Sequence, residues 1–269
     1  YVMGGLTPPK DSLQSFAIRQ FAAYFSLSRI MQDFLVEQGI DPDKIVLTYP
    51  GLDLEEIDGR EFQPASAVRE EFGLTPDQLL VVMVGNIRHW KGQHVVVEAL
   101  AGLSPEERKG IRLLFVGDTN AESAPYEARL QEAIRSHGLE RTVIFTGRRD
   151  DVPDLLEAAD IAVHSSVEPE PFGLVVQEAM IHGCATVAAD EGGPVEMITE
   201  DSGITFSPVG PSQLTRARQR LIHDEPLRTR LAEGARRRAR YFDQSRHVAL
   251  IEEHYRFLLP GASAREGVS

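Results

Sequence analysis

Cysteine and long apolar runs are scarce in this sequence of 269 residues. The one cysteine, Cys184, cannot form a disulfide within the chain, and it excludes a cysteine-rich zinc module. No segment approaches the roughly 18 consecutive apolar residues of a membrane-spanning helix, and no signal-like apolar stretch opens the chain. We therefore expect a cytoplasmic protein. The chain begins at Tyr1 rather than at a methionine, which is typical of a segment cut from a longer protein.

Positive charge is also scarce relative to negative charge. Lys and Arg total 28 against 41 Asp and Glu, so the formal net charge is -13 at pH 7 and the pI is about 5.1. General nucleic-acid binding needs a broad cationic surface, and this composition excludes it. Hydrophobic residues make up 42% of the sequence and charged residues 26%, which is ordinary for a globular protein and excludes a disordered or fibrous chain.

From residue 79 onwards, short apolar strands alternate with longer helical patterns. Strands that are apolar throughout and are followed by helices indicate a parallel sheet covered on both faces. The predicted fold class is therefore α/β, with a Rossmann-like, doubly wound parallel sheet whose ligands bind at the carboxyl ends of the strands. The expected strands are 79–84, 111–116, 142–146, 161–164, 185–188 and 204–206.

The two ends of the chain differ from this pattern. Apolar residues recur at three- and four-residue steps over 12–39, which predicts a mostly helical segment. A short strand is expected at 45–49, and the polar stretch 53–67 is typical of a linker. The tail 211–259 predicts three helices. Its arginine cluster at 236–240 is either an anion site or, in the interpretation we favour, a solvated helical face.

Three loops would meet at the carboxyl edge of this sheet. The first, 85–92, holds Arg88 and Lys91 between two glycines and precedes a helix, so it could receive an anion. An ordinary surface loop with a solvated lysine explains this segment equally well. The third loop, 190–196, contains a glycine pair that permits close backbone approach. Beside them, His164 ends a strand and has either a structural role there or a contact with a ligand.

The second loop, 165–173, gives the strongest signal. A helix begins near Gly173, so the amides of Phe172, Gly173 and Leu174 would point out of its start toward a phosphate. This helix is apolar nearly all round, which predicts burial, yet Glu178 lies at its middle. A buried carboxylate is unfavourable unless it accepts hydrogen bonds, which the vicinal hydroxyls of a ligand could supply. A capping or core-satisfied glutamate is the alternative.

Taken together, these segments resemble retaining family 4 glycosyltransferases. Glu170 and Glu178 bracket the stretch Pro-Phe-Gly-Leu-Val-Val-Gln, which is similar to the family signature of two glutamates separated by seven residues. The loop that carries Lys91 resembles the first loop of the family's C-terminal domain. Over residues 45–259, the resemblance implies the glycosyltransferase-B architecture, in which two Rossmann-like domains flank a cleft and the C-terminal domain binds the nucleotide sugar. Shorter matching segments fall in the expected order at 115–118, 145–148 and 159–164.

The resemblance also implies roles for single residues. Glu170 would contact hydroxyls of the donor sugar and Lys91 would neutralise the diphosphate, which makes both catalytic candidates. The family often has arginine where this chain has Asn86, and Arg88 is the candidate replacement. No metal ligands and no cofactor beyond the nucleotide-sugar substrate are expected. The donor- and nucleotide-binding candidates are Glu178 (ribose hydroxyls), Arg148 (base), Gly85, Asn86, Arg88, Gly117, Phe172, Gly173 and Leu174.

The predicted function is retaining transfer of a sugar from a nucleoside-diphosphate sugar to an acceptor hydroxyl, with this chain as the donor-binding part. UDP-, GDP- and ADP-sugars all fit as donors, and a sugar, a lipid or a polysaccharide fits as acceptor. The alternatives are a sucrose-phosphate-synthase-like enzyme and a non-catalytic nucleotide-sugar-binding module. A dehydrogenase is disfavoured because the chain lacks the glycine-rich first turn of that class.

The same resemblance divides the chain into four segments. Residues 1–50 would be a remnant of the N-terminal acceptor domain, 51–66 a linker, 67–243 the Rossmann-like nucleotide-sugar-binding domain, and 244–269 a C-terminal crossover helix and tail. Most of the acceptor domain is then expected to be missing, so the chain alone would bind donor and transfer little or no sugar. Association with the inner face of the membrane through the missing domain is a further option.

Overall fold

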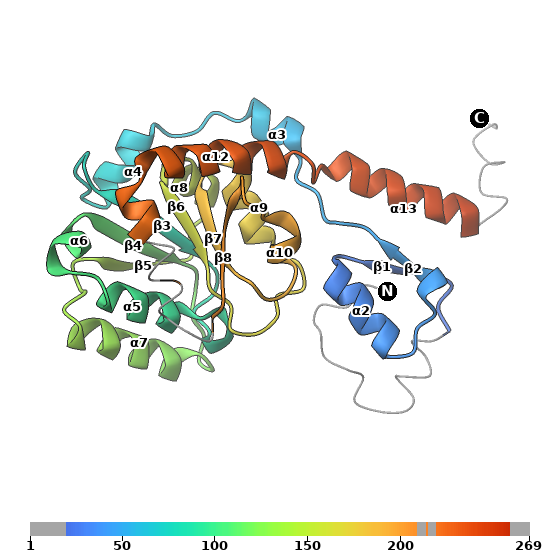
Figure 1. Ribbon diagram of the computed structural model, residues 1–269, viewed down its shortest axis with the longest axis horizontal. Helices are drawn as coiled ribbons and strands as arrows, with labels where there is room; N and C mark the ends of the chain where they lie inside the picture. The colour runs from blue at the N-terminus through green and yellow to red at the C-terminus, as the bar shows by residue number, and fades with distance from the viewer. Residues whose placement is uncertain (1–19, 209–213, 215–218, 259–269) are drawn as a thin grey trace. The chain divides into compact units, whose positions relative to one another are not determined.

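The computed structural model describes residues 20–208, 214 and 219–258 (Figure 1). The chain divides into two compact units, Tyr1–Gly59 with Tyr241–Ser269, and Arg60–Arg240. The division into four segments expected from the sequence stays a prediction. Within the described ranges, every helix is too short or too polar to cross a membrane.

The larger unit is built on a sheet of six parallel strands in the order β5-β4-β3-β6-β7-β8. Because β3 lies between β4 and β6, the chain winds outward from β3 in both directions, which confirms the predicted doubly wound α/β fold class. Ligands in such sheets bind where the winding direction reverses. The strands are β3 (Leu79–Val84), β4 (Ile111–Val116), β5 (Val143–Gly147), β6 (Ile161–His164), β7 (Ala185–Ala189) and β8 (Gly203–Phe206).

Helices cover both faces of this sheet (Figure 1). Alternate residues of β3 point to opposite faces, so Val81 and Met83 join one core, whereas Leu80 and Val82 join the other. The first core contains α5 (Gln93–Ala101) and α7 (Ala124–Ser136), and the second contains α4 (Ala65–Glu71), α8 (Val152–Ala158) and α9 (Leu174–Ile181). The long helix α12 (Glu225–Ala239) adds Leu227 and Leu231 to the first core. Shorter elements are η2 (His89–Lys91), α6 (Pro105–Lys109) and α10 (Pro194–Met197).

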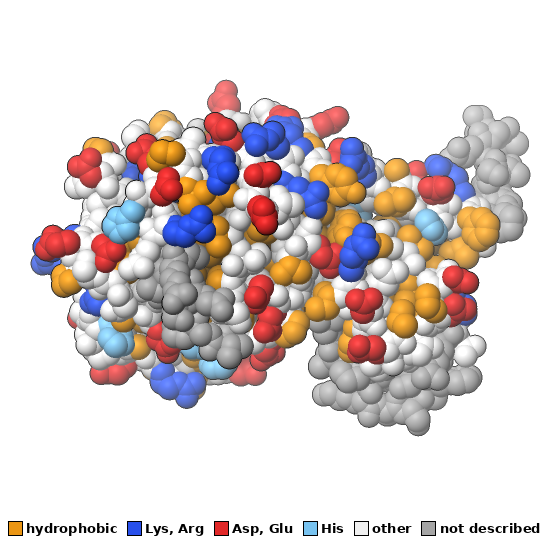
Figure 2. Space-filling view, viewed as in Figure 1, with side chains coloured by type: hydrophobic (Ala, Val, Ile, Leu, Met, Phe, Trp, Pro, Cys, Tyr) orange, Lys and Arg blue, Asp and Glu red, His pale blue; other side chains and the backbone are white. Residues whose placement is uncertain are grey.

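Two arginines of α12 contact neighbouring segments of the larger unit. Arg236 pairs with Glu157 of α8 at 2.8 Å. The guanidinium of Arg238 donates to the backbone oxygens of Met197 and Glu196 at 3.1 and 3.0 Å. The favoured interpretation of a solvated face fits Arg236, whose side chain is 51% exposed, whereas Arg238 is half-buried and binds the backbone of its neighbours. On the side of the molecule drawn in Figure 2, basic and acidic side chains are interspersed. This agrees with the net negative charge of the sequence.

The smaller unit corrects the helix predicted over 12–39. In its described part, Tyr24–Ser26 form β1, which pairs in parallel with β2 (Ile45–Leu47). The helix α2 (Arg29–Glu37) begins only after Ser28, whose hydroxyl caps it by accepting from the Met31 amide at 3.3 Å. Residues 12–19 lie outside the described part of the chain, as does most of 211–218. The other elements of this unit are η1 (Pro42–Lys44), α3 (Leu54–Gly59) and α13 (Gln244–Leu258).

Candidate functional site

The loops after β3 and β6 meet where the sheet reverses its winding direction. Lys91 ends the turn η2 after β3, and Glu170 lies between β6 and α9. The Lys91 ammonium donates to Oε2 of Glu170 at 2.6 Å, and the two side chains are 14% and 15% exposed. The structure therefore brings the two catalytic candidates, which lie 79 positions apart in the sequence, into one mostly buried ion pair.

Further groups surround this ion pair. The Nε2 atom of His164 lies 3.4 Å from Oε2 of Glu170 and 3.1 Å from the hydroxyl of Ser166. That hydroxyl lies 3.5 Å from the same carboxylate oxygen. On the other side of the pair, the Lys91 ammonium lies over the Trp90 ring, 4.1 Å from its centroid, which is a favourable cation–π distance. Lys91 is thus held between a carboxylate and an aromatic face.

Two glycine contacts set the position of these loops. Gly192, at φ +85°, pairs with Glu170 in an isolated parallel bridge, and a Cβ there would lie 2.2 Å from the Glu170 carbonyl oxygen. Gly92, at φ +75°, lies against the end of β6, where a Cβ would be 1.9 Å from the Ser165 carbonyl oxygen. Both positions need the left-handed backbone and the missing side chain that glycine alone provides.

The ionisation of Glu170 reflects these neighbours. Burial raises the pKa of its carboxyl, but the His164 hydrogen bond and the Lys91 charge together outweigh burial and lower that pKa from 4.5 to about 2. Because the folded-state pKa lies below the unfolded one, the ionised carboxylate stabilises the folded chain at neutral pH. This stabilisation is lost as the pH falls from about 4.5 toward 2.

We therefore expect Glu170→Gln to reduce the loss of stability in acid. Between pH 7 and pH 3, the unfolding free energy of the wild type should fall more than that of the variant, because the variant has no carboxylate to protonate. Urea unfolding followed by circular dichroism at both pH values measures the difference. Glu168→Gln, an exposed position on the same loop, serves as the control and should keep the wild-type change. Equal losses in wild type and Glu170→Gln would contradict a stabilising carboxylate.

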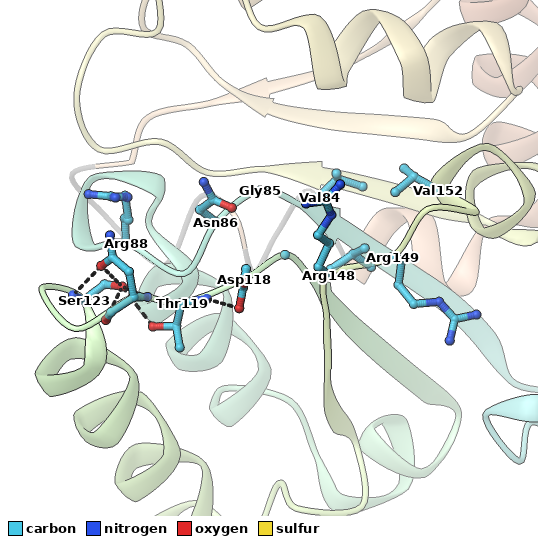
Figure 3. A pocket seen from close by; sticks show the side chains of 13 residues that line it. Val84, Gly85, Asn86, Arg88, Asp118, Thr119, Ser123, Arg148, Arg149 and Val152 are labelled. Atoms are coloured by element: carbon cyan, nitrogen blue, oxygen red, sulfur yellow. Dashed lines mark hydrogen bonds between the residues drawn. The ribbon is translucent and has the colours of Figure 1, made fainter.

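A cavity of about 480 Å³ opens at the same edge of the sheet, next to β3, β4 and β5. In Figure 3, Asn86 and Arg88 project from the loop after β3, and Arg148 projects from the end of β5. At its floor, Gly117 approaches so closely that a Cβ would lie 2.3 Å from the Gly85 carbonyl oxygen. Five of the sequence-predicted residues therefore line one cavity: Gly85, Asn86, Arg88, Gly117 and Arg148.

Of the three arginines that line this cavity, Arg149 is held by Glu71 and Asp151, whereas Arg88 and Arg148 pair, among the described residues, only with exposed carboxylates. Arg88 lies 3.4 Å from the exposed carboxylate of Glu122, and Arg148 lies 3.5 Å from the exposed carboxylate of Asp150. Exposed pairs of this kind contribute little to stability, so both guanidinium groups can exchange partners at low cost. Whether Arg88 supplies the cation that the family often has at position 86 stays a prediction.

The start of α9 lies directly after Glu170. Gly173, at φ +92°, is the N-cap residue, and the first bond of the helix runs from the Val176 amide to the Gly173 oxygen at 2.9 Å. The amides before Val176 donate to no carbonyl within the helix, as expected for the first turn of a helix. Of the predicted residues here, Phe172 buries its side chain in the protein, whereas Leu174 is 51% exposed. Phe172 could therefore contact a ligand only through its backbone.

The sequence predicts a buried Glu178 on this helix, and the structure places it on α9 at a half-buried position. Burial raises the pKa of its carboxyl. Among the described residues, no donor lies within hydrogen-bond distance of this carboxylate. Its oxygens are not among the fully buried, unpaired atoms of the described residues, so water can reach them, and the ribose-binding role of Glu178 stays a prediction. In the described part of the chain, no group of three or more His, Cys, Asp or Glu side chains is arranged to hold a metal ion.

Comparison with solved structures defines the class of fold. The crystal structure of Anabaena Alr3699/HepE in complex with UDP and glucose has a TM-score of 0.81 at 27% identity and covers 91% of this chain and 65% of that one. Sucrose-phosphate synthase from Thermosynechococcus elongatus has a TM-score of 0.80 at 24% identity, over 93% and 61% of the two chains, and shows the fold alone. The chain has the fold of glycosyltransferase-B enzymes, as the sequence resemblance implies.

Comparison of sequences identifies the family. The model of the family described as Glycosyl transferases group 1 matches residues 65–238, and the chain belongs to this family. It is 30% identical over 226 residues to a D-inositol 3-phosphate glycosyltransferase of Streptomyces bingchenggensis, covering 81% of this chain and 48% of the relative. The corresponding protein of Salinispora arenicola is 31% identical over 234 residues, which is 83% and 52% of the two chains. The chain thus spans about half the length of these curated relatives.

Proposed function

We propose that this chain is the donor-binding part of a retaining, family 4 glycosyltransferase that transfers a sugar from a nucleoside-diphosphate sugar to an acceptor hydroxyl. The observation that carries the proposal is the Lys91–Glu170 pair at the edge of the sheet where the winding direction reverses, in the loops that follow β3 and precede α9. The aliphatic part of Lys91 lies near Gly85, which lines the cavity. Support also comes from Alr3699/HepE, at 27–28% identity, which was crystallised with UDP and with UDP-glucose.

Different residues of the proposed site would bind different parts of the nucleotide sugar. Negative charge grows on the diphosphate as it leaves, and the Lys91 ammonium and the first amides of α9 would stabilise this charge. Glu170 would accept a hydrogen bond from a hydroxyl of the sugar. Glu178 would accept hydrogen bonds from the ribose hydroxyls, which would satisfy its otherwise unpaired carboxylate. The cavity with Arg148 would take the base. This scheme assigns no step to a metal ion.

A candidate can be named for the donor but not for the acceptor. A uridine nucleotide is the first candidate donor because the ligands of the Alr3699/HepE structures are UDP and UDP-glucose. We propose no particular acceptor, since the chain spans about half the length of its curated relatives. A non-catalytic binding module would share the cavity and the lysine, and it would differ from an enzyme by binding the donor without transferring its sugar.

Isothermal titration calorimetry against UDP, GDP, ADP and their glucose conjugates tests the proposal. We expect binding of at least one nucleoside diphosphate, with the uridine nucleotide as the first candidate. Binding of the diphosphate and of its sugar conjugate by the chain of 269 residues would support a donor-binding part. If none of the six compounds binds, the donor-binding function is wrong.

Glu178→Gln is expected to weaken binding of the nucleoside diphosphate by about tenfold or more, because hydrogen bonds to an ionised acceptor contribute ~1.5–3 kcal/mol. The same variant should be slightly more stable than the wild type at pH 7. Burial raises the pKa of Glu178, so its ionised form destabilises the folded chain and the neutral amide relieves this effect. Calorimetry and urea unfolding measure the two changes. Unchanged nucleotide affinity would remove Glu178 from the ribose site, and Glu168→Gln should leave both quantities unchanged.

A further inference from the structure

We infer that His164 is a positioning residue, which together with Ser166 holds Oε2 of Glu170 after the donor diphosphate has drawn Lys91 away, and so keeps Oε1 open for a hydroxyl of the donor sugar. The inference rests on the proposed function and deepens it. It assigns the recognition of the sugar, as distinct from the nucleotide, to a pair of residues behind Glu170.

The contacts of Glu170 divide unequally between its two carboxylate oxygens. Lys91, His164 and Ser166 all approach Oε2, at 2.6, 3.4 and 3.5 Å. Among the described residues, no donor lies within hydrogen-bond distance of Oε1. A carboxylate with one oxygen fixed by the protein and the other one open has a free acceptor in a defined direction, which is the geometry that recognition of a ligand hydroxyl requires.

The distances show which partner dominates before the donor binds. Lys91 makes the short contact, while those of His164 and Ser166 are long for hydrogen bonds. A diphosphate carries more charge than one carboxylate and would compete for the same ammonium. Glu170 would then need other donors, because a mostly buried carboxylate without a donor is strongly destabilised. The side chains of His164 and Ser166 are already directed at the correct oxygen.

His164 is well placed to be a fixed donor. It is 5% exposed and lies on β6, where it is in register with Ala188 of β7. Its Nδ1 atom is buried and has no hydrogen-bond partner among the described residues. The ring nitrogen that faces polar groups is therefore Nε2, where an N–H can donate. This N–H faces Ser166 and Glu170, either directly or through the serine hydroxyl.

Calorimetry with UDP and UDP-glucose on the 269-residue chain tests this role. His164→Leu fills the buried position at the strand end with an apolar side chain and removes the donor. We expect it to weaken UDP-glucose binding by about tenfold, as for loss of a charge-assisted hydrogen bond, and to change UDP binding by less than about twofold. His164→Gln returns an N–H near the position of Nε2 and should restore most of the affinity for UDP-glucose.

The outcomes separate this inference from the proposed function. If the wild type binds neither UDP nor UDP-glucose, the uridine donor proposal fails and the inference fails with it. If the wild type binds both and His164→Leu leaves their affinity ratio unchanged, the inference alone is wrong. Equal weakening of both ligands, with a fall in unfolding free energy that His164→Gln does not rescue, would show a merely structural histidine. Ser166→Ala, combined with His164→Leu, should add less than its single effect, because the two act on one oxygen.

Discussion

Lys91→Ala is expected to lower the affinity for the nucleoside diphosphate by at least about tenfold, and to slow sugar transfer by the complete enzyme by roughly one to two orders of magnitude. The ammonium is the cation beside Glu170 and the start of α9, and its charge would stabilise the leaving diphosphate. Calorimetry on this chain and initial rates on the complete enzyme measure the two effects. Lys109→Ala, which removes a 71% exposed lysine, is the matched control.

Lys91→Ala should also lower the stability of the chain, and a second substitution separates this effect from the loss of nucleotide affinity. Lys91→Ala leaves Glu170 mostly buried with only the long contacts to His164 and Ser166, so the unfolding free energy should also fall. Adding Glu170→Gln removes the unpaired charge and should recover part of this stability without recovering nucleotide affinity. Near-normal turnover of Lys91→Ala, or recovery of nucleotide affinity in the double variant, would contradict the role assigned to the lysine.

Gly92→Ala is expected to cause the largest loss of stability in this part of the chain, about 3 kcal/mol or more. The left-handed backbone alone disfavours alanine by about 1–2 kcal/mol. In addition, the new Cβ would lie 1.9 Å from the Ser165 carbonyl oxygen, which is backbone and cannot rotate away. Gly138→Ala is the matched control, since Gly138 has φ +64° and a Cβ there meets nothing within 4 Å.

Urea unfolding of the two glycine variants separates the two contributions. Gly138→Ala measures the backbone effect, and the additional loss in Gly92→Ala measures the overlap with the end of β6. The Ser165 hydroxyl also donates to the carbonyl oxygens of Gly92 and Lys91, at 2.9 and 3.2 Å. A shift here would therefore displace Lys91 from Glu170 and weaken nucleotide binding as well. Equal stability losses in the two variants would show that the loop relaxes freely.

The sheet and its site loops could be predicted because their signals are local. Each strand of the larger unit is apolar over its whole length and is followed by a helical pattern, so the parallel order and the shared carboxyl edge follow from chain topology. The loops with Lys91 and Glu170 must then lie at that edge. The apolar pattern of α9 predicts a buried helix, and this is met only in part, because Glu178 is half-buried and Leu174 is 51% exposed.

Other features depend on contacts between distant segments. The segment at Tyr24–Ser26 has a helical apolar pattern, but pairing with Ile45–Leu47 makes it a strand. The direct contact of Lys91 with Glu170 needs the side-chain rotamers of both loops, which residue spacing does not determine. For the same reason, His164 and Ser166 could not be assigned to Oε2 of Glu170. Their only sequence signal is a polar pair at the end of an otherwise apolar strand.

The location of the whole candidate site inside Arg60–Arg240 has a consequence for engineering. Lys91, Glu170 and the groups that hold them belong to one compact unit with its own two cores, so the proposed donor site lies within a single unit of the chain. On the proposed function, chimeras that join this unit to the acceptor-binding half of a relative should keep the choice of activated sugar and change the product. Donor choice and product choice would then evolve, or be designed, independently.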